Sequence, residues 1–144
     1  MKKSLCFTTS VLLMLAFILT GCGAVLEEAA KLSEYEAGDD RIPSITSVVG
    51  EREVTGVESS VKNGIVSKQY TYVSNSVYDD LLAYVSALME DGWLVTKDID
   101  LKVVPGSGEL GKKSSEEGQI VLLSFAYEDS KYTINITKGK GTIE

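Results

Sequence analysis

The sequence predicts an α+β domain in which one twisted antiparallel sheet of about five strands carries a single helix on one face. Three observations lead to this prediction: a hairpin signal at Asn63-Gly64, an amphipathic helical stretch after it, and a second strand pair near the C-terminus. The expected order is strand, strand, helix, strand, strand, strand. The short connections between these elements favour antiparallel neighbours.

The first hairpin is set by Asn63 and Gly64, which supply the positive φ angles of a two-residue turn between two β-rich runs. Counting outward from this turn fixes the register of the two strands. The apolar face then gathers the pairs Val61 with Val66, Val57 with Tyr70, and Thr55 with Tyr72. Polar side chains such as Glu58 and Gln69 fall on the other face, so one face is predicted to be core and the other solvent.

The helix is predicted to run from Val77 to Asp91. Ser76 is expected to cap its start together with Asp79, and Gly92 to end it in a left-handed conformation. Trp93 follows directly and is interpreted as a core anchor. The buried stripe is predicted to comprise Val77, Leu81, Tyr84, Val85 and Leu88.

The C-terminal part is predicted to contain three strands, at Trp93 to Val104, Gln119 to Tyr127 and Lys131 to Thr137. A tight turn at Asp129-Ser130 joins the last two. Their predicted apolar pairs are Phe125 with Ile134, Leu123 with Ile136, and Tyr127 with Tyr132. Residues Pro105 to Gly118, with four glycines, are expected to form a long loop that is either mobile or functional.

The N-terminus has the layout of a secretory signal peptide. Lys2 and Lys3 precede an apolar run at Val11 to Leu19, which is too short for a bilayer-spanning helix. The sequence Leu19-Thr20-Gly21-Cys22 resembles the lipobox of bacterial lipoproteins, with a branched apolar residue, two small residues and a cysteine. The resemblance covers only the leader, residues 1–21.

The lipoprotein resemblance implies that Cys22 receives a diacylglyceryl group on its sulfur and that cleavage falls between Gly21 and Cys22. The mature chain would then be anchored on the extracytoplasmic face of the cell membrane. Residues 22–44 are expected to form a partly helical acidic tether, and residues 45–144 the α+β domain. The body is also similar in layout to small uncharacterised lipoproteins of single-membrane bacteria, which carries over no functional residue. The final membrane in a two-membrane cell stays open.

Composition excludes several classes of function. The chain has 14 basic and 21 acidic residues, and loss of Lys2 and Lys3 with the leader leaves 12 against 21, a net charge of −9. Such a surface repels nucleic acid and anionic lipid. The chain has no histidine, and its two cysteines are Cys6 in the leader and Cys22. Serine-histidine triads, cysteine-histidine pairs and His or Cys metal cages are therefore excluded from the mature domain. We expect a protein that is not an enzyme and uses no cofactor.

Two groups of charged residues are candidates for binding. Asp98 and Asp100, two apart on a predicted strand, would point to one side and present two carboxylates to calcium; a charged strand edge is the alternative. Lys112 and Lys113 follow a glycine-rich stretch that fails the phosphate-loop spacing, and they are predicted to contact an acidic partner. The adjacent acidic pairs Asp39-Asp40, Asp79-Asp80 and Glu116-Glu117 are expected to be solvated surface.

The leading functional hypothesis is a lipid-anchored, non-enzymatic module that binds an envelope protein or a cell-wall component. The alternative is a lipoprotein that binds a small ligand or glycan for uptake or sensing, which requires a concave site or an uncovered aromatic platform. A third hypothesis, an enzyme limited to carboxylate chemistry, requires two facing acids in a cleft.

Overall fold

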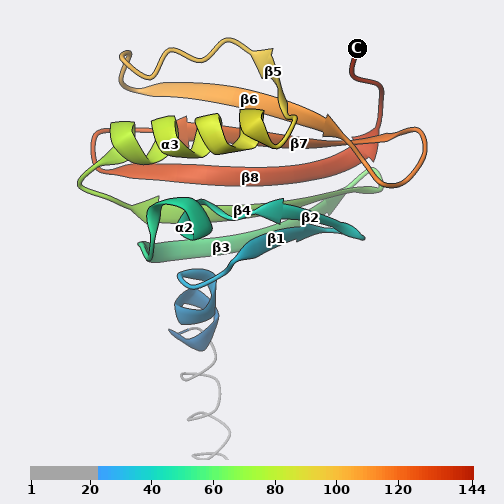
Figure 1. Ribbon diagram of the computed structural model, residues 1–144. Helices are drawn as coiled ribbons and strands as arrows, with labels where there is room; N and C mark the ends of the chain where they lie inside the picture. Colours follow the sequence, from blue (N-terminus) through green and yellow to red (C-terminus); the bar gives the residue numbers. More distant parts are fainter. Residues whose placement is uncertain (1–22) are drawn as a thin grey trace, which may run out of the picture.

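The computed structural model describes residues 23–144, in which a six-stranded antiparallel sheet forms the centre of an α+β fold (Figure 1). The spatial order of its strands is β3-β4-β8-β7-β6-β5, and β1 and β2 form a separate two-stranded sheet. The elements are β1 (Glu34–Ala37), β2 (Asp40–Pro43), α2 (Ile45–Val49), β3 (Glu53–Lys62), β4 (Ile65–Val73), α3 (Val77–Glu90), β5 (Leu94–Lys97), β6 (Gly106–Lys113), β7 (Gln119–Tyr127) and β8 (Lys131–Lys140).

The α+β class and the antiparallel sheet are confirmed, but the predicted five strands and single helix differ from the structure. The main sheet has six strands, a second sheet adds two, and α2 joins α3 on the same side. Helix α3 buries Leu81, Tyr84 and Leu88 completely against the sheet. The opposite face of the sheet carries polar pairs such as Ser67 with Thr137, whose hydroxyl oxygens lie 3.0 Å apart. The core therefore lies on one side of the sheet only.

The predicted registers of the two hairpins hold at five of the six pairs. Val61 faces Val66 and Val57 faces Tyr70, as the turn geometry requires, and the three pairs between β7 and β8 also form. Asn63 and Gly64 have φ values of 53° and 77°. The pair of Thr55 with Tyr72 is wrong, because a bulge between Val54 and Gly56 shifts the register and places Val54 opposite Tyr72.

The predicted tether differs most from the structure. Residues 23–29 are helical, but residues 34–43 form the β1–β2 hairpin instead of a spacer that reaches residue 44. Tyr35 stacks on Tyr70 with ring centroids 4.6 Å apart, and its hydroxyl lies 2.7 Å from that of Tyr72. Tyr35 and Ile42 are each only 1% exposed, so this hairpin belongs to the core. The acidic residues Glu34 and Glu36 alternate with Tyr35 along β1 and face outward.

The predicted loop from Pro105 to Gly118 is also wrong, because its first half forms β6, and the predicted third strand ends early, at Lys97. Glycines in β6 leave space above the sheet for the segment that returns from β5. A Cβ added at Gly108 would lie 2.5 Å from the Phe125 ring and 2.7 Å from Ile99. The glycines that suggest a loop therefore allow close packing on a strand.

Helix α3 begins and ends close to the predicted residues, but its capping differs from the prediction. The Ser76 side chain forms no capping hydrogen bond. Instead, the Ser74 hydroxyl accepts a hydrogen bond from the Ser76 N–H at 3.0 Å and donates one to Asp80 at 2.6 Å. Gly92, with a φ of 87°, ends the helix as predicted, and Trp93 is buried in the core.

Candidate functional site

Cys22, predicted to carry the lipid, and Gly21, predicted to precede the cleavage site, lie outside the described residues. Within residues 23–144, no helix is long and apolar enough to cross a membrane.

More than half of the exposed large apolar side chains of the described domain lie on α3, β5 and the segment after β5. Seven of the twelve exposed large apolar side chains among the described residues are found there: Tyr78, Leu82, Met89, Leu94, Val95, Val103 and Val104. Beside them, a groove of about 500 Å³ runs between the outer side of α3 and residues 95–102. We call it the α3–β5 groove. Tyr78, Leu82, Met89 and Val95 line this groove. Isolated apolar residues on a surface are common, whereas a group that lines one groove is typical of an interaction site.

Helical spacing explains why α3 carries two apolar stripes. The buried stripe contains Leu81, Tyr84 and Leu88, and a second stripe at Tyr78, Leu82 and Met89 lies one position further along. The second stripe is about half-exposed, at 45%, 45% and 53%. Sequence reasoning missed it, although the apolar arc of the helix is wider than one buried face needs.

Two carboxylates border the α3–β5 groove. Asp98 and Asp100 line it together with Lys102, and neither aspartate forms an ion pair within the described residues. They follow β5 instead of lying within a strand, so the predicted alternation that would point both to one side does not apply. The Asp100 carboxylate accepts a hydrogen bond from the Lys102 N–H at 3.1 Å. No group of three or more metal-ligating side chains occurs in residues 23–144.

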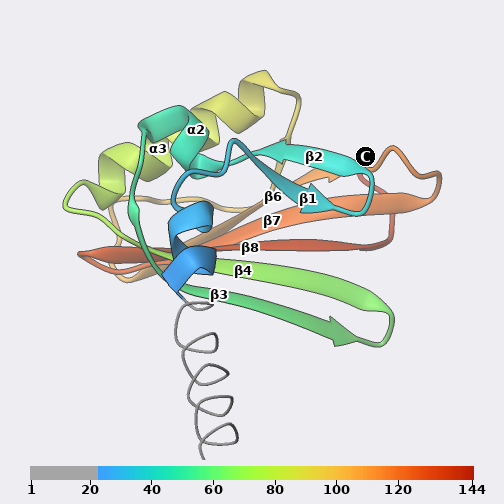
Figure 2. The same ribbon diagram turned by 90° about the horizontal axis from the view of Figure 1, so that it is seen from below.

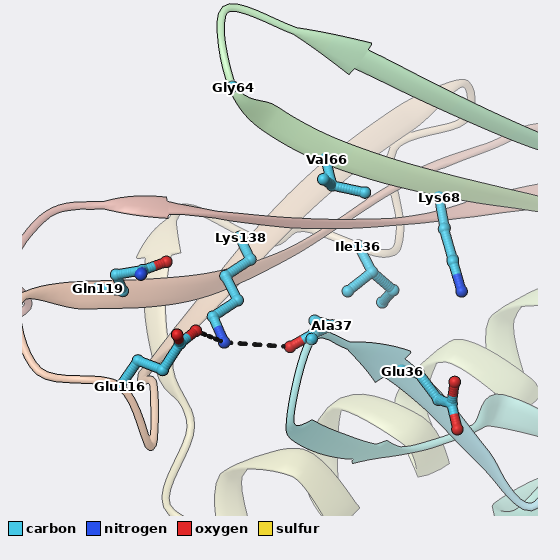
Figure 3. Close-up of a pocket in the computed structure, with 10 residues that line it drawn as sticks. Glu36, Ala37, Gly64, Val66, Lys68, Glu116, Gln119, Ile136 and Lys138 are labelled. Atoms are coloured by element: carbon cyan, nitrogen blue, oxygen red, sulfur yellow. Dashed lines mark hydrogen bonds and ion pairs between the residues drawn. The ribbon is translucent and has the colours of Figure 1, made fainter.

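A second hollow lies between the tip of the β1–β2 hairpin and strands β4 and β8 (Figure 3). We call this space, of about 400 Å³, the hairpin pocket. Ala37, Val66 and Ile136 provide apolar walls, and Lys68 and Glu36 stand at its rim. Lys68 forms no ion pair within the described residues, and Glu36 lies at the same rim.

The other lysine of the hairpin pocket, Lys138, is already neutralised. Its side chain is 9% exposed, and its Nζ lies 2.8 Å from an Asp40 carboxylate oxygen. Lys138 also pairs with Glu116 and donates a hydrogen bond to the Ala37 carbonyl at 3.3 Å (Figure 3). Hydrogen bonds to Asp40 and Glu116 raise the pKa of Lys138. Burial by itself would raise the pKa of Asp40, but hydrogen bonds from Lys138, Ser114 and Ser115 hold it well below its usual range. This cluster ties the β6–β7 loop and the β1–β2 hairpin to β8.

The predicted contact residues Lys112 and Lys113 do not form one surface. Adjacent residues on a strand point to opposite faces, so Lys112 lies on the side of α3 and Lys113 on the polar side of the sheet. Lys112 pairs with Asp91 at 2.9 Å and donates to the Asp91 carbonyl at 2.7 Å, near the end of α3. Lys113 is exposed.

Asp80 is the most buried carboxylate described, at 3% exposure, contrary to the expectation of solvated surface. It accepts two hydrogen bonds from Arg52, at 2.7 and 2.8 Å, and further ones from Ser74 at 2.6 Å and Tyr132 at 3.2 Å. Burial would raise the pKa of Asp80, but the bonds from Arg52, Ser74 and Tyr132 lower it. All four of these hydrogen bonds come from residues inside the fold, which indicates a structural role. Asp40, also expected at the surface, is paired in the same way with Lys138.

No protein-family model matches this chain, and neither does any curated protein or solved structure with which it was compared.

Proposed function

We propose that this protein is a lipid-anchored, extracytoplasmic binding module without catalytic activity, and that it binds a partner protein of the cell envelope through the α3–β5 groove. The observation that carries the binding function is the concentration of seven exposed apolar side chains on α3, β5 and the following segment. The lipobox-like sequence Leu19 to Cys22 supports the anchor and the location.

The chemistry of the groove defines its occupant. The stripe of Tyr78, Leu82 and Met89 suits apolar side chains of a partner segment, and their burial would contribute roughly 25 cal/mol per Å² of apolar area removed from water. Asp98 and Asp100 line the same groove and form no ion pair within the described residues, although Lys102 also lines it. We therefore propose a protein segment that combines apolar residues with at least one lysine or arginine.

A site-specific cross-linking experiment tests the groove in intact cells. A photoreactive residue at Tyr78 of the full chain should give one discrete protein adduct, whereas the same residue at Val48, which is also exposed on a helix, should not. The adduct should be lost on Met89→Asp and weakened by the double change Asp98→Asn and Asp100→Asn. Adducts that are as abundant from Val48, or that are indifferent to both changes, would contradict the proposal.

The lipid anchor has its own test. The full chain should incorporate an alkyne fatty acid and remain with membranes, and Cys22→Ala should abolish both properties. Cys6→Ala is the matched control, because Cys6 lies in the part that is expected to be cleaved. Membrane retention of a cleaved Cys22→Ala product would refute lipid anchoring through this residue.

The alternative function, binding of a small ligand or glycan, is favoured by one observation, the unpaired Lys68 at the rim of the hairpin pocket. A cation beside apolar walls suits a small molecule that carries a carboxylate. Soluble carboxylate-bearing cell-wall fragments are the probe, and Lys68→Ala should remove any thermal stabilisation that they produce. A shift that persists in Lys68→Ala would exclude this pocket.

A further inference from the structure

The outer edge of the main sheet at β3 is long and unpaired. Among the described residues β3 is the terminal strand of the sheet, with ten residues and only β4 as a neighbour. Its second half, Glu58 to Lys62, consists of five consecutive exposed residues, so neither of its faces is covered. Figure 2 shows the tip of the β3–β4 hairpin at the margin of the molecule, away from α2 and α3. Such an edge is a template for another strand.

The backbone of this edge presents its hydrogen-bonding groups at known positions. Lys62 and Ile65 flank the two-residue turn, and in such a hairpin the flanking residues exchange both backbone hydrogen bonds. The alternation along an antiparallel strand then turns the N–H and C=O groups of Ser59 and Val61 outward, away from β4. A second strand can therefore pair with the edge at these odd-numbered positions.

The side chains of the edge are complementary to a second copy in one register. When two β3 strands lie antiparallel and are centred on Ser60, Glu58 of each copy faces Lys62 of the other. Ser59 then faces Val61, so the outward backbone groups also match. Registers centred on Glu58 or Lys62 would instead place like charges opposite each other, which is destabilising. Within residues 23–144 neither Glu58 nor Lys62 forms an ion pair, so both charges remain available.

An apolar contribution supports the same register. Val61 is 73% exposed, more than any other large apolar side chain described, and Val66 beside it is 48% exposed. In the pair centred on Ser60, each Val61 side chain lies beside Ser59 and the backbone of the other copy, so pairing removes part of its surface from water.

We propose that two copies of this chain associate through their β3 edges, antiparallel and centred on Ser60, to form a continuous twelve-stranded sheet from two six-stranded ones. The ion pairs between Glu58 and Lys62 favour a second copy over other strands. When the dimer forms, the outward backbone groups of both β3 edges are hydrogen-bonded. The proposal does not depend on the lipid anchor or on the α3–β5 groove, which lies at the opposite edge of the sheet.

Disulfide trapping of the full chain in cells tests the register. Ser60→Cys places two cysteines opposite each other on the proposed twofold axis, so oxidation should produce a covalent dimer. Ser107→Cys, exposed on β6, is the matched control, and the chain without an added cysteine sets the background from Cys6 and Cys22. A Ser60→Cys yield no higher than that of Ser107→Cys would overturn the proposal.

Charge reversal provides the second arm. In the Ser60→Cys background, Glu58→Lys alone and Lys62→Glu alone each create two like-charge pairs and should reduce the dimer yield by about fivefold or more. The double variant restores opposite charges and should recover the yield. A double variant that stays as low as the single ones would refute pairing in this register.

The two proposals fail independently. Met89→Asp in the groove should leave the Ser60→Cys dimer unchanged, and Glu58→Lys should leave the Tyr78 adduct unchanged. Loss of the dimer on Met89→Asp would show that association uses the groove and would overturn the β3 assignment.

Discussion

The buried carboxylate of Asp80 offers the sharpest test of how this fold is held together. Asp80→Asn keeps the shape of the side chain but removes its charge and replaces one acceptor oxygen with an N–H donor. That donor would face Arg52, Ser74 or Tyr132, all of which donate to Asp80 in the structure. The substitution therefore leaves the Arg52 charge without its partner and sets donors against each other.

The expected loss of stability follows from burial. Removing one member of a buried ion pair costs roughly 3–5 kcal/mol. The Arg52 side chain is 26% exposed and can regain some water, whereas that of Asp80 is 3% exposed. We therefore expect the lower end of the range, about 3 kcal/mol. At roughly 3–5 °C per kcal/mol for a domain of this size, the Tm should fall by about 10–15 °C.

The assay is thermal and urea unfolding followed by circular dichroism, on a soluble form that begins at residue 23. Asp79→Asn is the matched control, because Asp79 lies in the same first turn of α3 and is exposed. Any effect of charge on the helix dipole is shared by both variants, so the difference between them isolates the buried network. Equal losses in the two variants would refute the reasoning.

Three further predictions use the same unfolding assay. Leu88→Ala, at a fully buried position, should lower the free energy of unfolding by about 2–5 kcal/mol. Met89→Ala next to it, half-exposed in the groove, should change that free energy by no more than about 0.5 kcal/mol. Similar losses in the two variants would show that the second stripe is part of the core. Gly108→Ala should cost about 1–3 kcal/mol, because the added Cβ would lie 2.5 Å from the Phe125 ring, and an unchanged Tm would mean that β6 is not packed as described. The lowered pKa of Asp80 makes its stabilising effect complete above the unfolded-state value near pH 4, and the effect should be lost as the pH falls below about 4 toward the folded-state pKa. Asp80→Asn should therefore show a flatter loss of stability between about pH 5 and pH 2, and a slope as steep as that of the unchanged chain would contradict this origin.

Local signals in the sequence were sufficient where geometry leaves few choices. Asn63-Gly64 determined the register of the first hairpin, because a two-residue turn with positive φ angles admits one pairing. The apolar stripe and Gly92 determined the extent of α3 within one residue. The tight turn at Asp129-Ser130, together with the alternation of apolar residues, placed Phe125 opposite Ile134 in the last hairpin. The same reasoning failed at Thr55, since a bulge is one extra residue and its position depends on what packs around the strand.

The candidate sites were harder to predict from the sequence than the fold was. Lys112 and Lys113 were predicted as a joint contact because they follow glycines, but their strand places them on opposite faces. The α3–β5 groove lies between α3, which ends at Glu90, and residues 95–102, and no periodic pattern along the chain indicates that these two surfaces meet. Its exposed stripe was nevertheless present in the helical spacing of Tyr78, Leu82 and Met89.

The sequence by itself determined the class of fold, the position of the helix, the pairing of two hairpins and the absence of histidine chemistry, because these depend on composition and on neighbours along the chain. Only the tertiary structure decided that Tyr35 and Ile42 of the acidic segment 34–43 belong to the core. It also decided that the glycines of β6 make room for Ile99 and Phe125, and that Asp80 is buried with Arg52. In each of these cases the stabilising free energy comes from a contact with a residue distant in sequence. The residue type shows whether a side chain tolerates water or allows close packing, but the fold determines whether it contacts water or another side chain.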